Sequence, residues 1–146
     1  MSQRIVSPCV GMCSTTVGDR VCRGCQRHDG EIREWFGFSD RERELRMLAL
    51  DTLREQVAGR FLCVVDAQAL EAQMCRHRIR FRAEQPALSR AVELLRVGRQ
   101  RIRDLSRYGL EPVLEGEGLP PETLHVALTE ALLREAYRRQ QHDVLC

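Results

Sequence analysis

Four cysteines lie close together near the N-terminus at a spacing typical of metal ligands. They follow the pattern C-x3-C-x8-C-x2-C and span only 17 residues: Cys9, Cys13, Cys22 and Cys25. Four thiolates suit tetrahedral zinc or an iron-sulfur cluster, because soft sulfur donors favour both and a closed sulfur shell leaves no position for a substrate. The sequence therefore predicts one metal centre, a zinc ion or an iron-sulfur cluster, bound by these four residues.

The residues around the second cysteine pair suit such a centre. Gly24, between Cys22 and Cys25, is expected to let the chain turn back tightly, so that backbone N–H groups point at the sulfurs. Three arginines lie in the same stretch: Arg20, Arg23 and Arg27. Because a four-thiolate site would be dianionic, their positive charge would stabilise it. His28 is expected at a solvated helix start, with a role near the metal as the alternative.

Cysteine usage and the apolar pattern bear on the compartment. The chain has an odd count of seven cysteines, and its first residues carry no apolar run long enough for an export signal, which favours reduced thiols over disulfides. No stretch approaches the roughly 20 apolar residues that cross a bilayer. We therefore expect a cytoplasmic protein without a membrane partner, in which Cys63, Cys75 and Cys146 are structural or incidental.

A second feature is a basic segment. Residues 76–107 carry ten arginines against three acidic residues. The strict alternation over residues 76–82 predicts a strand with arginines on one face, and a long helix expected from Pro86 to about Tyr108 would gather four more arginines on one side. The two stripes are Arg76, Arg78, Arg80 and Arg82 on the strand, and Arg96, Arg99, Arg103 and Arg107 on the helix.

The arginine stripes have two possible partners, a nucleic acid or the acidic segment of the same chain. Their spacing matches the footprint of nucleic-acid phosphates, although few aromatic residues are at hand to stack on bases. The segment that follows is acidic and could instead neutralise the stripes within the chain, through Glu111, Glu115, Glu117 and Glu122.

The remaining elements are mainly helical. Asp29 is expected to cap a short helix that places Trp35 and Phe36 against the body. Ser39 and Glu42 form a capping box, which predicts a helix over residues 40–57. Its apolar stripe is Leu45, Leu48, Ala49, Leu53 and Val57.

Further along, residues 61–65 read as a strand, and Asp66 can cap a helix over residues 67–76. A last helix follows Pro120 and Pro121. Its inward residues are expected to be Leu124, Leu128, Ala131, Leu132 and Tyr137. The predicted fold is α+β and mainly helical, with a four-cysteine metal knuckle in a domain of residues 1–58 and a helical body with a small two-stranded sheet in residues 59–146.

The N-terminal motifs resemble a known family. Ser7-Pro8-Cys9 through Cys13, then Cys22-Arg-Gly-Cys25 and Trp35-x-x-Phe38-Ser39-Asp40, are similar to a bacterial four-cysteine family of unknown function that is catalogued as predicted iron-sulfur proteins. The resemblance covers roughly residues 5–50. It implies an iron-sulfur cluster on the four cysteines and carries no activity for the rest of the chain.

Two functional hypotheses follow. The sequence contains no phosphate-binding glycine loop, nucleophile elbow or His-Glu zinc-protease motif, so a non-catalytic role is expected. In the leading hypothesis, a zinc or iron-sulfur module docks a protein or RNA partner. The alternative is an iron-sulfur protein that transfers electrons or assists a redox reaction.

Overall fold

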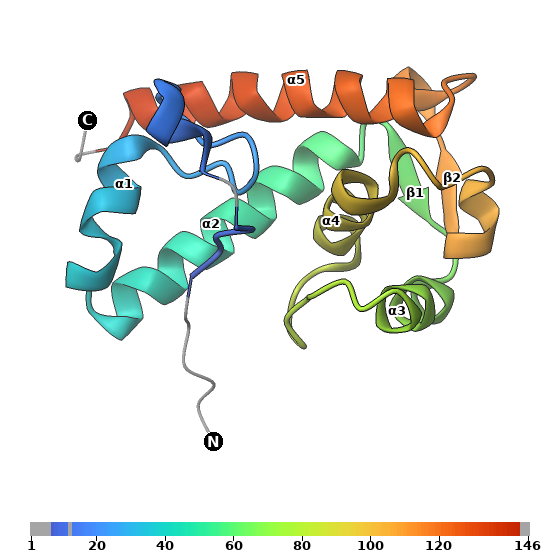
Figure 1. The fold of residues 1–146 in the computed structure, drawn as a ribbon, viewed down its shortest axis with the longest axis horizontal. Helices are drawn as coiled ribbons and strands as arrows, with labels where there is room; N and C mark the ends of the chain where they lie inside the picture. Colours follow the sequence, from blue (N-terminus) through green and yellow to red (C-terminus); the bar gives the residue numbers. More distant parts are fainter. Residues whose placement is uncertain (1–6, 12, 144–146) are drawn as a thin grey trace. The chain divides into compact units, whose positions relative to one another are not determined.

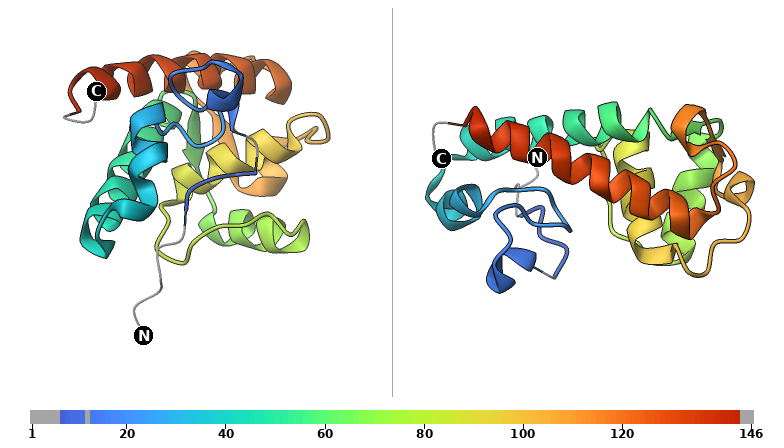
Figure 2. Two further views of the ribbon diagram at one scale, coloured as in Figure 1. Left: turned by 60° about the vertical axis from the view of Figure 1, so that its left-hand side comes forward. Right: turned by 90° about the horizontal axis from the view of Figure 1, so that it is seen from above.

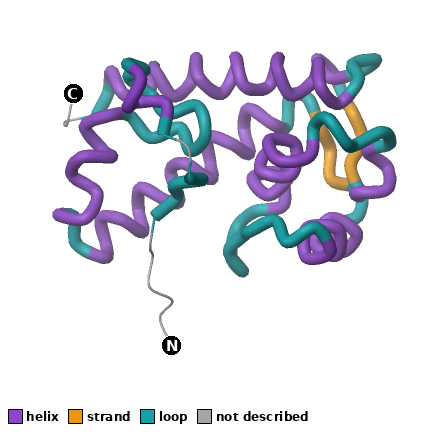
Figure 3. The backbone as a smooth tube through the Cα atoms, in the orientation of Figure 1, coloured by secondary structure: helices purple, strands orange, loops and turns teal. Residues whose placement is uncertain are grey.

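The computed structural model describes residues 7–11 and 13–143 and is mainly helical (Figures 1 and 3). The elements of the described residues are α1 (Asp29–Glu34), α2 (Asp40–Ala58), β1 (Leu62–Val64), α3 (Ala67–Arg76), α4 (Ala87–Gly98), β2 (Leu110–Pro112) and α5 (Pro121–Gln141). Four short 3-10 turns complete them: η1 (Ser14–Val17), η2 (Trp35–Gly37), η3 (Leu105–Tyr108) and η4 (Leu114–Gly116). The predicted fold class, mainly helical α+β with a small two-stranded sheet, is confirmed.

The chain forms two compact units. One comprises Met1–Leu53 with Ala131–Cys146, and the other comprises Arg54–Glu130. The division falls within α2 and within α5, so each of these helices contributes residues to both units. The domains expected from the sequence, 1–58 and 59–146, stay a prediction, because compactness alone does not test which segments fold independently. Among the helices of the described residues, none has the length and apolar character needed to span a membrane.

In the unit that contains Cys9, Cys13, Cys22 and Cys25, α1 and η2 place one aromatic residue in the core. Trp35 is completely buried, whereas Phe36 is 79% exposed. Neighbouring side chains of a 3-10 turn point about 120° apart, so only one of the two can face inward. The expectation that both residues pack against the body is therefore wrong for Phe36.

The start of α2 agrees with the sequence. Ser39 Oγ accepts a hydrogen bond from the Glu42 N–H at 3.1 Å, as its place in the capping box predicts. The reciprocal half of the box differs, because the Glu42 carboxylate accepts from Arg46 Nε at 2.9 Å. Ser39 is thus the residue whose side chain stabilises the first turn.

Ser39→Ala is expected to lower the free energy of unfolding by roughly 0.5 to 2 kcal/mol, because it leaves a backbone donor of the first turn without its cap. Urea unfolding followed by circular dichroism measures the change. Thr52→Ala is a matched control on the same helix, since its exposed hydroxyl only donates to the Leu48 carbonyl. Equal curves for the two variants would show that the Ser39 cap contributes nothing.

The buried stripe of α2 differs from the expected one. Leu45 and Leu48 are 45% and 53% exposed, respectively. The side chains that face inward are Met47, Leu50, Leu53 and Val57. A leucine-rich helix offers two overlapping stripes at helical spacing. In α5 the predicted inward residues are confirmed up to Leu132, but Ala136 is buried in place of Tyr137.

In the unit formed by Arg54–Glu130, the sheet has a different partner strand from the expected one. β1 pairs antiparallel with β2, with Cys63 opposite Glu111, and Figure 1 shows the two strands side by side.

Asp66 caps α3 as predicted, through a hydrogen bond from the Ala69 N–H at 3.1 Å. Residues 76–82 form no strand. Arg78 has a φ of 56°, a left-handed conformation that follows the end of α3 and breaks any strand there.

The long helix expected after Pro86 ends early. α4 stops at Gly98, and Asp104 then caps the separate turn η3 by accepting from the Ser106 N–H at 3.0 Å. Gly109 ends η3 with a φ of 70°, and a Cβ there would lie 2.1 Å from the Asp66 carbonyl oxygen. The apolar residues that suggested one helix thus belong to two elements.

Candidate functional site

The second cysteine pair lies in the turn of a hairpin. Val21 and His28 form an antiparallel bridge, and the Cys22 N–H donates to the Arg27 carbonyl at 2.9 Å. The left-handed residue of the turn is Gln26, with a φ of 65°. The Gln26 N–H donates to the Cys22 carbonyl at 2.8 Å. This turn brings Cys22 and Cys25 to the same place.

Cys22 and Cys25 form a buried, hydrogen-bonded thiol pair. Each is only 1% exposed. The pKa of Cys22 is lowered to about 4, chiefly because the Cys25 thiol donates to its sulfur and also because backbone N–H groups of Cys25, Ser14 and Gly24 donate to it. The same shared proton, together with burial, raises the pKa of Cys25. The expected backbone donors to sulfur are thus present around Cys22.

Arg27 is the counter-charge of this pair. Its side chain is almost completely buried, its Nε donates to the Cys25 sulfur at 3.4 Å, and its guanidinium lies 4.9 Å from the centre of the Trp35 ring. In the part of the chain that the structure describes, no carboxylate forms a salt bridge with Arg27. A buried cation needs polar partners, and here the Cys25 sulfur supplies one.

The first cysteine pair is half-buried and lies in the preceding segment. The Gly11 N–H donates to the Cys9 sulfur at 3.4 Å, and Cys13 Sγ lies 2.8 Å from Thr15 Oγ1. The Arg23 N–H donates to Ser14 Oγ at 2.9 Å. This bond joins the residue after Cys13 to the hairpin that carries the second pair.

The four thiols are not gathered into one closed shell. All four cysteines lie in the described residues, and no three of their sulfurs lie within 4.8 Å of one another. Around a tetrahedral zinc ion the sulfurs would be about 3.8 Å apart, given Zn–S bonds of about 2.3 Å. The structure therefore brings Cys22 and Cys25 together. The segment of Cys13 is joined to their hairpin by the bond between Ser14 and Arg23. A metal bound by all four sulfurs would have to draw them closer together. The donor chemistry and the buried cation fit a thiolate metal centre.

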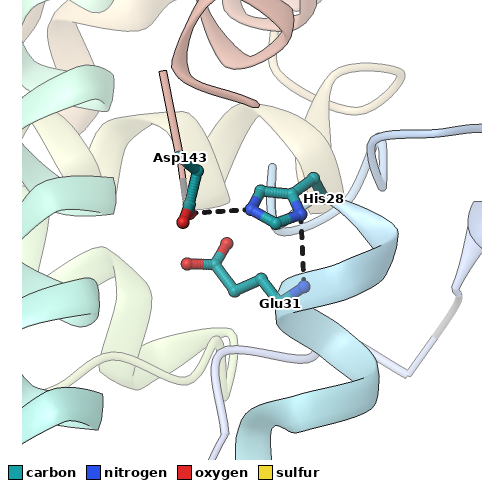
Figure 4. Close-up of side chains that lie close together, drawn as sticks. All are labelled: His28, Glu31 and Asp143. Atoms are coloured by element: carbon teal, nitrogen blue, oxygen red, sulfur yellow. Dashed lines mark hydrogen bonds and ion pairs between the residues drawn. The ribbon is translucent and has the colours of Figure 1, made fainter. Parts of the chain in front are cut away.

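A second cluster in the same unit contains His28, Glu31 and Asp143 (Figure 4). His28 is the true cap of α1, because its Nδ1 accepts from the Glu31 N–H at 3.2 Å. Its Nε2 lies 2.8 Å from Asp143 Oδ2. His28 is buried, so the expectations of a solvated His28 and of an Asp29 cap are both wrong. The sequence offers no local signal for a contact between residues this far apart.

Hydrogen bonding argues that this second cluster is an ion-pair network and not a metal site. Since Nδ1 of His28 accepts a hydrogen bond, a neutral His28 carries its proton on Nε2 and donates it to Asp143. The carboxylates of Glu31 and Asp143 accept hydrogen bonds from arginine side chains. Arg46 Nη1 donates to Glu31 at 2.7 Å and to Asp143 at 2.8 Å, and Arg139 Nη1 donates to Glu31 at 2.7 Å. Within this unit the network joins α1, α2 and the end of α5, which Figure 2 shows close together.

The arginine stripes do not form the two faces that the sequence suggested. Arg76 ends α3, and the residues that follow it lie in a loop, so no strand face exists. Of the supposed helix stripe, only Arg96 lies on α4. The remaining three lie at its end, in the next loop and in η3: Arg99, Arg103 and Arg107.

The acids that pair with the stripes also differ from the expected ones. Arg96 pairs with Glu93 at 2.6 Å and Arg82 with Glu84 at 3.5 Å. Glu115, which was expected to neutralise a stripe, pairs with Arg60 at 2.6 Å. Arg82 and Arg96 are thus paired with sequence neighbours. Neutralisation of the other stripe residues by the acidic segment stays a prediction, and so does their nucleic-acid role.

The fold and the site describe a small, mainly helical protein with a cluster of thiols near its N-terminus. Residues 7–54 match the model of a family described as a protein of unknown function, DUF1289. The match includes the four cysteines, α1 and most of α2, and it agrees with the extent of the resemblance seen in the sequence. Comparison with curated proteins gave no match, and comparison with solved structures gave none either.

Proposed function

We propose that the N-terminal segment is a non-catalytic metal-binding module, with a zinc ion or an iron-sulfur cluster held by Cys9, Cys13, Cys22 and Cys25. In this proposal the unit formed by Arg54–Glu130 docks a protein or RNA partner. The observation that carries the metal assignment is the buried Cys22–Cys25 pair, in which hydrogen bonds lower the pKa of Cys22 and a buried guanidinium contacts the Cys25 sulfur.

The surroundings of the sulfurs support ligation. Cysteine binds a metal ion as the thiolate. The backbone N–H groups that donate to the Cys22 sulfur favour this form before any ion binds. Arg27 offsets part of the charge of a four-thiolate centre. When bound, the metal supplies the attraction that holds this loop segment together. A shell of four sulfurs exposes no position for a substrate, which agrees with a structural role.

The second candidate is an iron-sulfur electron-transfer or redox-accessory protein. The observation in its favour is the set of N–H donors directed at sulfur, from the backbone around Cys22 and from Arg27 Nε to Cys25. Hydrogen bonds to the sulfurs are one of the factors that set the potential of such clusters. The two candidates share ligands and differ in the metal.

Metal analysis of the full chain purified without oxygen tests the proposal and separates the candidates. A structural module is expected to contain one zinc ion per chain and to be colourless, whereas a cluster protein is expected to contain iron and acid-labile sulfide and to absorb visible light. The double variant Cys63→Ser with Cys75→Ser is the control, because both thiols are exposed, and it should retain the metal. A protein that binds neither zinc nor a reconstituted cluster would refute the metal centre.

A further inference from the structure

A pair of rings lies on the surface of the unit formed by Arg54–Glu130. His77 follows the last residue of α3 and Tyr108 is the last residue of η3. Their ring centres are 6.4 Å apart and their planes are inclined by 32°. His77 is exposed and Tyr108 is half-buried. The two residues are far apart in the sequence and meet only because α3 packs beside η3. The sequence alone therefore gave no sign of a ring pair.

Both rings are held by well-defined turns. The His77 N–H donates to the Gln73 carbonyl at 3.0 Å, and the Ile79 N–H donates to the Met74 carbonyl at 2.8 Å across the left-handed residue Arg78. Tyr108 is followed by Gly109, whose backbone lies against Asp66 too closely for a side chain. The ring pair is therefore positioned by the backbone.

Three exposed arginines are immediate sequence neighbours of the two ring residues. Arg76 and Arg78 flank His77, and Arg107 precedes Tyr108. In the described residues no salt bridge joins any of these three to a carboxylate, in contrast to Arg90 and Arg96, which pair with Glu71 and Glu93. The acid closest in sequence to Arg107 is Asp104, whose carboxylate accepts hydrogen bonds from Ser106. Besides these hydrogen bonds, the charge of Arg107 also helps to lower the pKa of Asp104, so this arginine has an electrostatic partner without a salt bridge.

We propose that the ring surface, defined as Arg76, His77, Arg78, Arg107 and Tyr108, binds single-stranded nucleic acid. A base stacks on the exposed face of the His77 ring, with Tyr108 behind it, and the arginines pair with phosphates. This inference deepens the docking part of the proposed function and does not depend on the metal.

The chemistry of the surface favours a single strand over other partners. Stacking on a side chain requires an unstacked base, which duplexes do not offer. An acidic protein would match the arginines, but it would make no use of an exposed ring that lies 6.4 Å from a second ring. Guanidinium groups bind phosphate through paired N–H donors, so rings and arginines together fit a strand of bases and phosphates.

Fluorescence polarisation with the full chain tests the inference, using labelled single-stranded RNA and DNA of about ten nucleotides and a duplex of the same sequence. The single strands are expected to bind more tightly than the duplex. His77→Ala should weaken single-strand binding by about tenfold. Replacing Arg76, Arg78 and Arg107 with Gln should lower the magnitude of the salt slope by about two, because each phosphate contact in a single strand contributes about 0.7.

Matched controls lie in the other unit. Phe36→Ala removes another exposed ring, and the double variant Arg41→Gln with Arg138→Gln removes exposed charges that pair with Glu44 and Glu135. Both should bind as the unmodified protein does. The inference is overturned if no strand binds at low salt, if the duplex binds as tightly as the single strand, if His77→Ala has no effect, or if polyglutamate competes as well as RNA.

The metal proposal and this inference fail separately. Cys22→Ser protein that has lost its metal should still bind the single strand, which would sustain the ring surface whatever the cysteines do. Conversely, His77→Ala protein should keep the metal content of the unmodified chain. Thermal melts of each variant establish that a loss of binding is not a loss of folding.

Discussion

Replacing Cys22 with serine is expected to abolish metal binding and to unfold the hairpin around residues 20–29, while α3 and α4 keep their structure. The described segment before α1 buries few apolar side chains, so it cannot offset the entropy of ordering without ligation. The expected loss is the binding free energy of the metal itself, roughly 10 kcal/mol or more for a structural zinc site. Of the four proposed ligands, Cys22 is chosen because the Cys25 thiol and backbone N–H groups donate to its sulfur and lower its pKa.

Two measurements check this result. Metal analysis reports the stoichiometry, and amide hydrogen exchange reports the hairpin through the Cys22 N–H, which donates to the Arg27 carbonyl. Cys63→Ser is the matched control, because its thiol is exposed and lies in the other unit. Full metal content in the Cys22→Ser protein would show that Cys22 is not a ligand. Metal loss with an intact hairpin would show that ligation does not hold the segment.

Glu31→Gln is expected to lower the free energy of unfolding by roughly 3 to 5 kcal/mol, because removing one member of a buried ion-pair network leaves the other charges uncompensated. The Glu31 side chain is completely buried between the guanidinium groups of Arg46 and Arg139. The amide keeps the shape of the carboxylate but can accept from only one side. Glu135→Gln is the matched control, since its exposed pair with Arg138 should contribute about 0 to 1 kcal/mol.

The same substitution should change the response to acid. Burial by itself would raise the pKa of Glu31, but hydrogen bonds and charge from Arg139 and Arg46 outweigh it, so the pKa is lowered. A group whose folded pKa is lowered stabilises the protein above its unfolded pKa, about 4.3 for glutamate, and loses that contribution as pH falls below it. Urea unfolding at several pH values should therefore show a steeper acid loss for the unmodified protein than for Glu31→Gln. Parallel curves would mean that folding does not lower the pKa of Glu31.

Local signals predicted the starts of α2 and α3 correctly, but not the cap of α1 or the end of α4. Ser39 and Asp66 cap helices as expected, because a cap needs only the residue and the two or three that follow it. The alternation over residues 76–82 and the apolar run after Pro86 were misread for a common reason. Each pattern continues past a backbone reversal, at Arg78 with its left-handed φ and after Gly98 at the end of α4. Side-chain periodicity does not report such a reversal.

The sequence by itself determined the cysteine spacing, the basic character of residues 76–107 and the mainly helical fold, because all three depend on residues close together in the chain. Only the tertiary structure decided which groups meet over long separations. Asp143 reaches His28, Tyr108 reaches His77, and Arg27 turns its guanidinium inward onto Trp35. Such contacts arise when packed helices bury side chains together, and a buried charge then requires a partner wherever the fold supplies one.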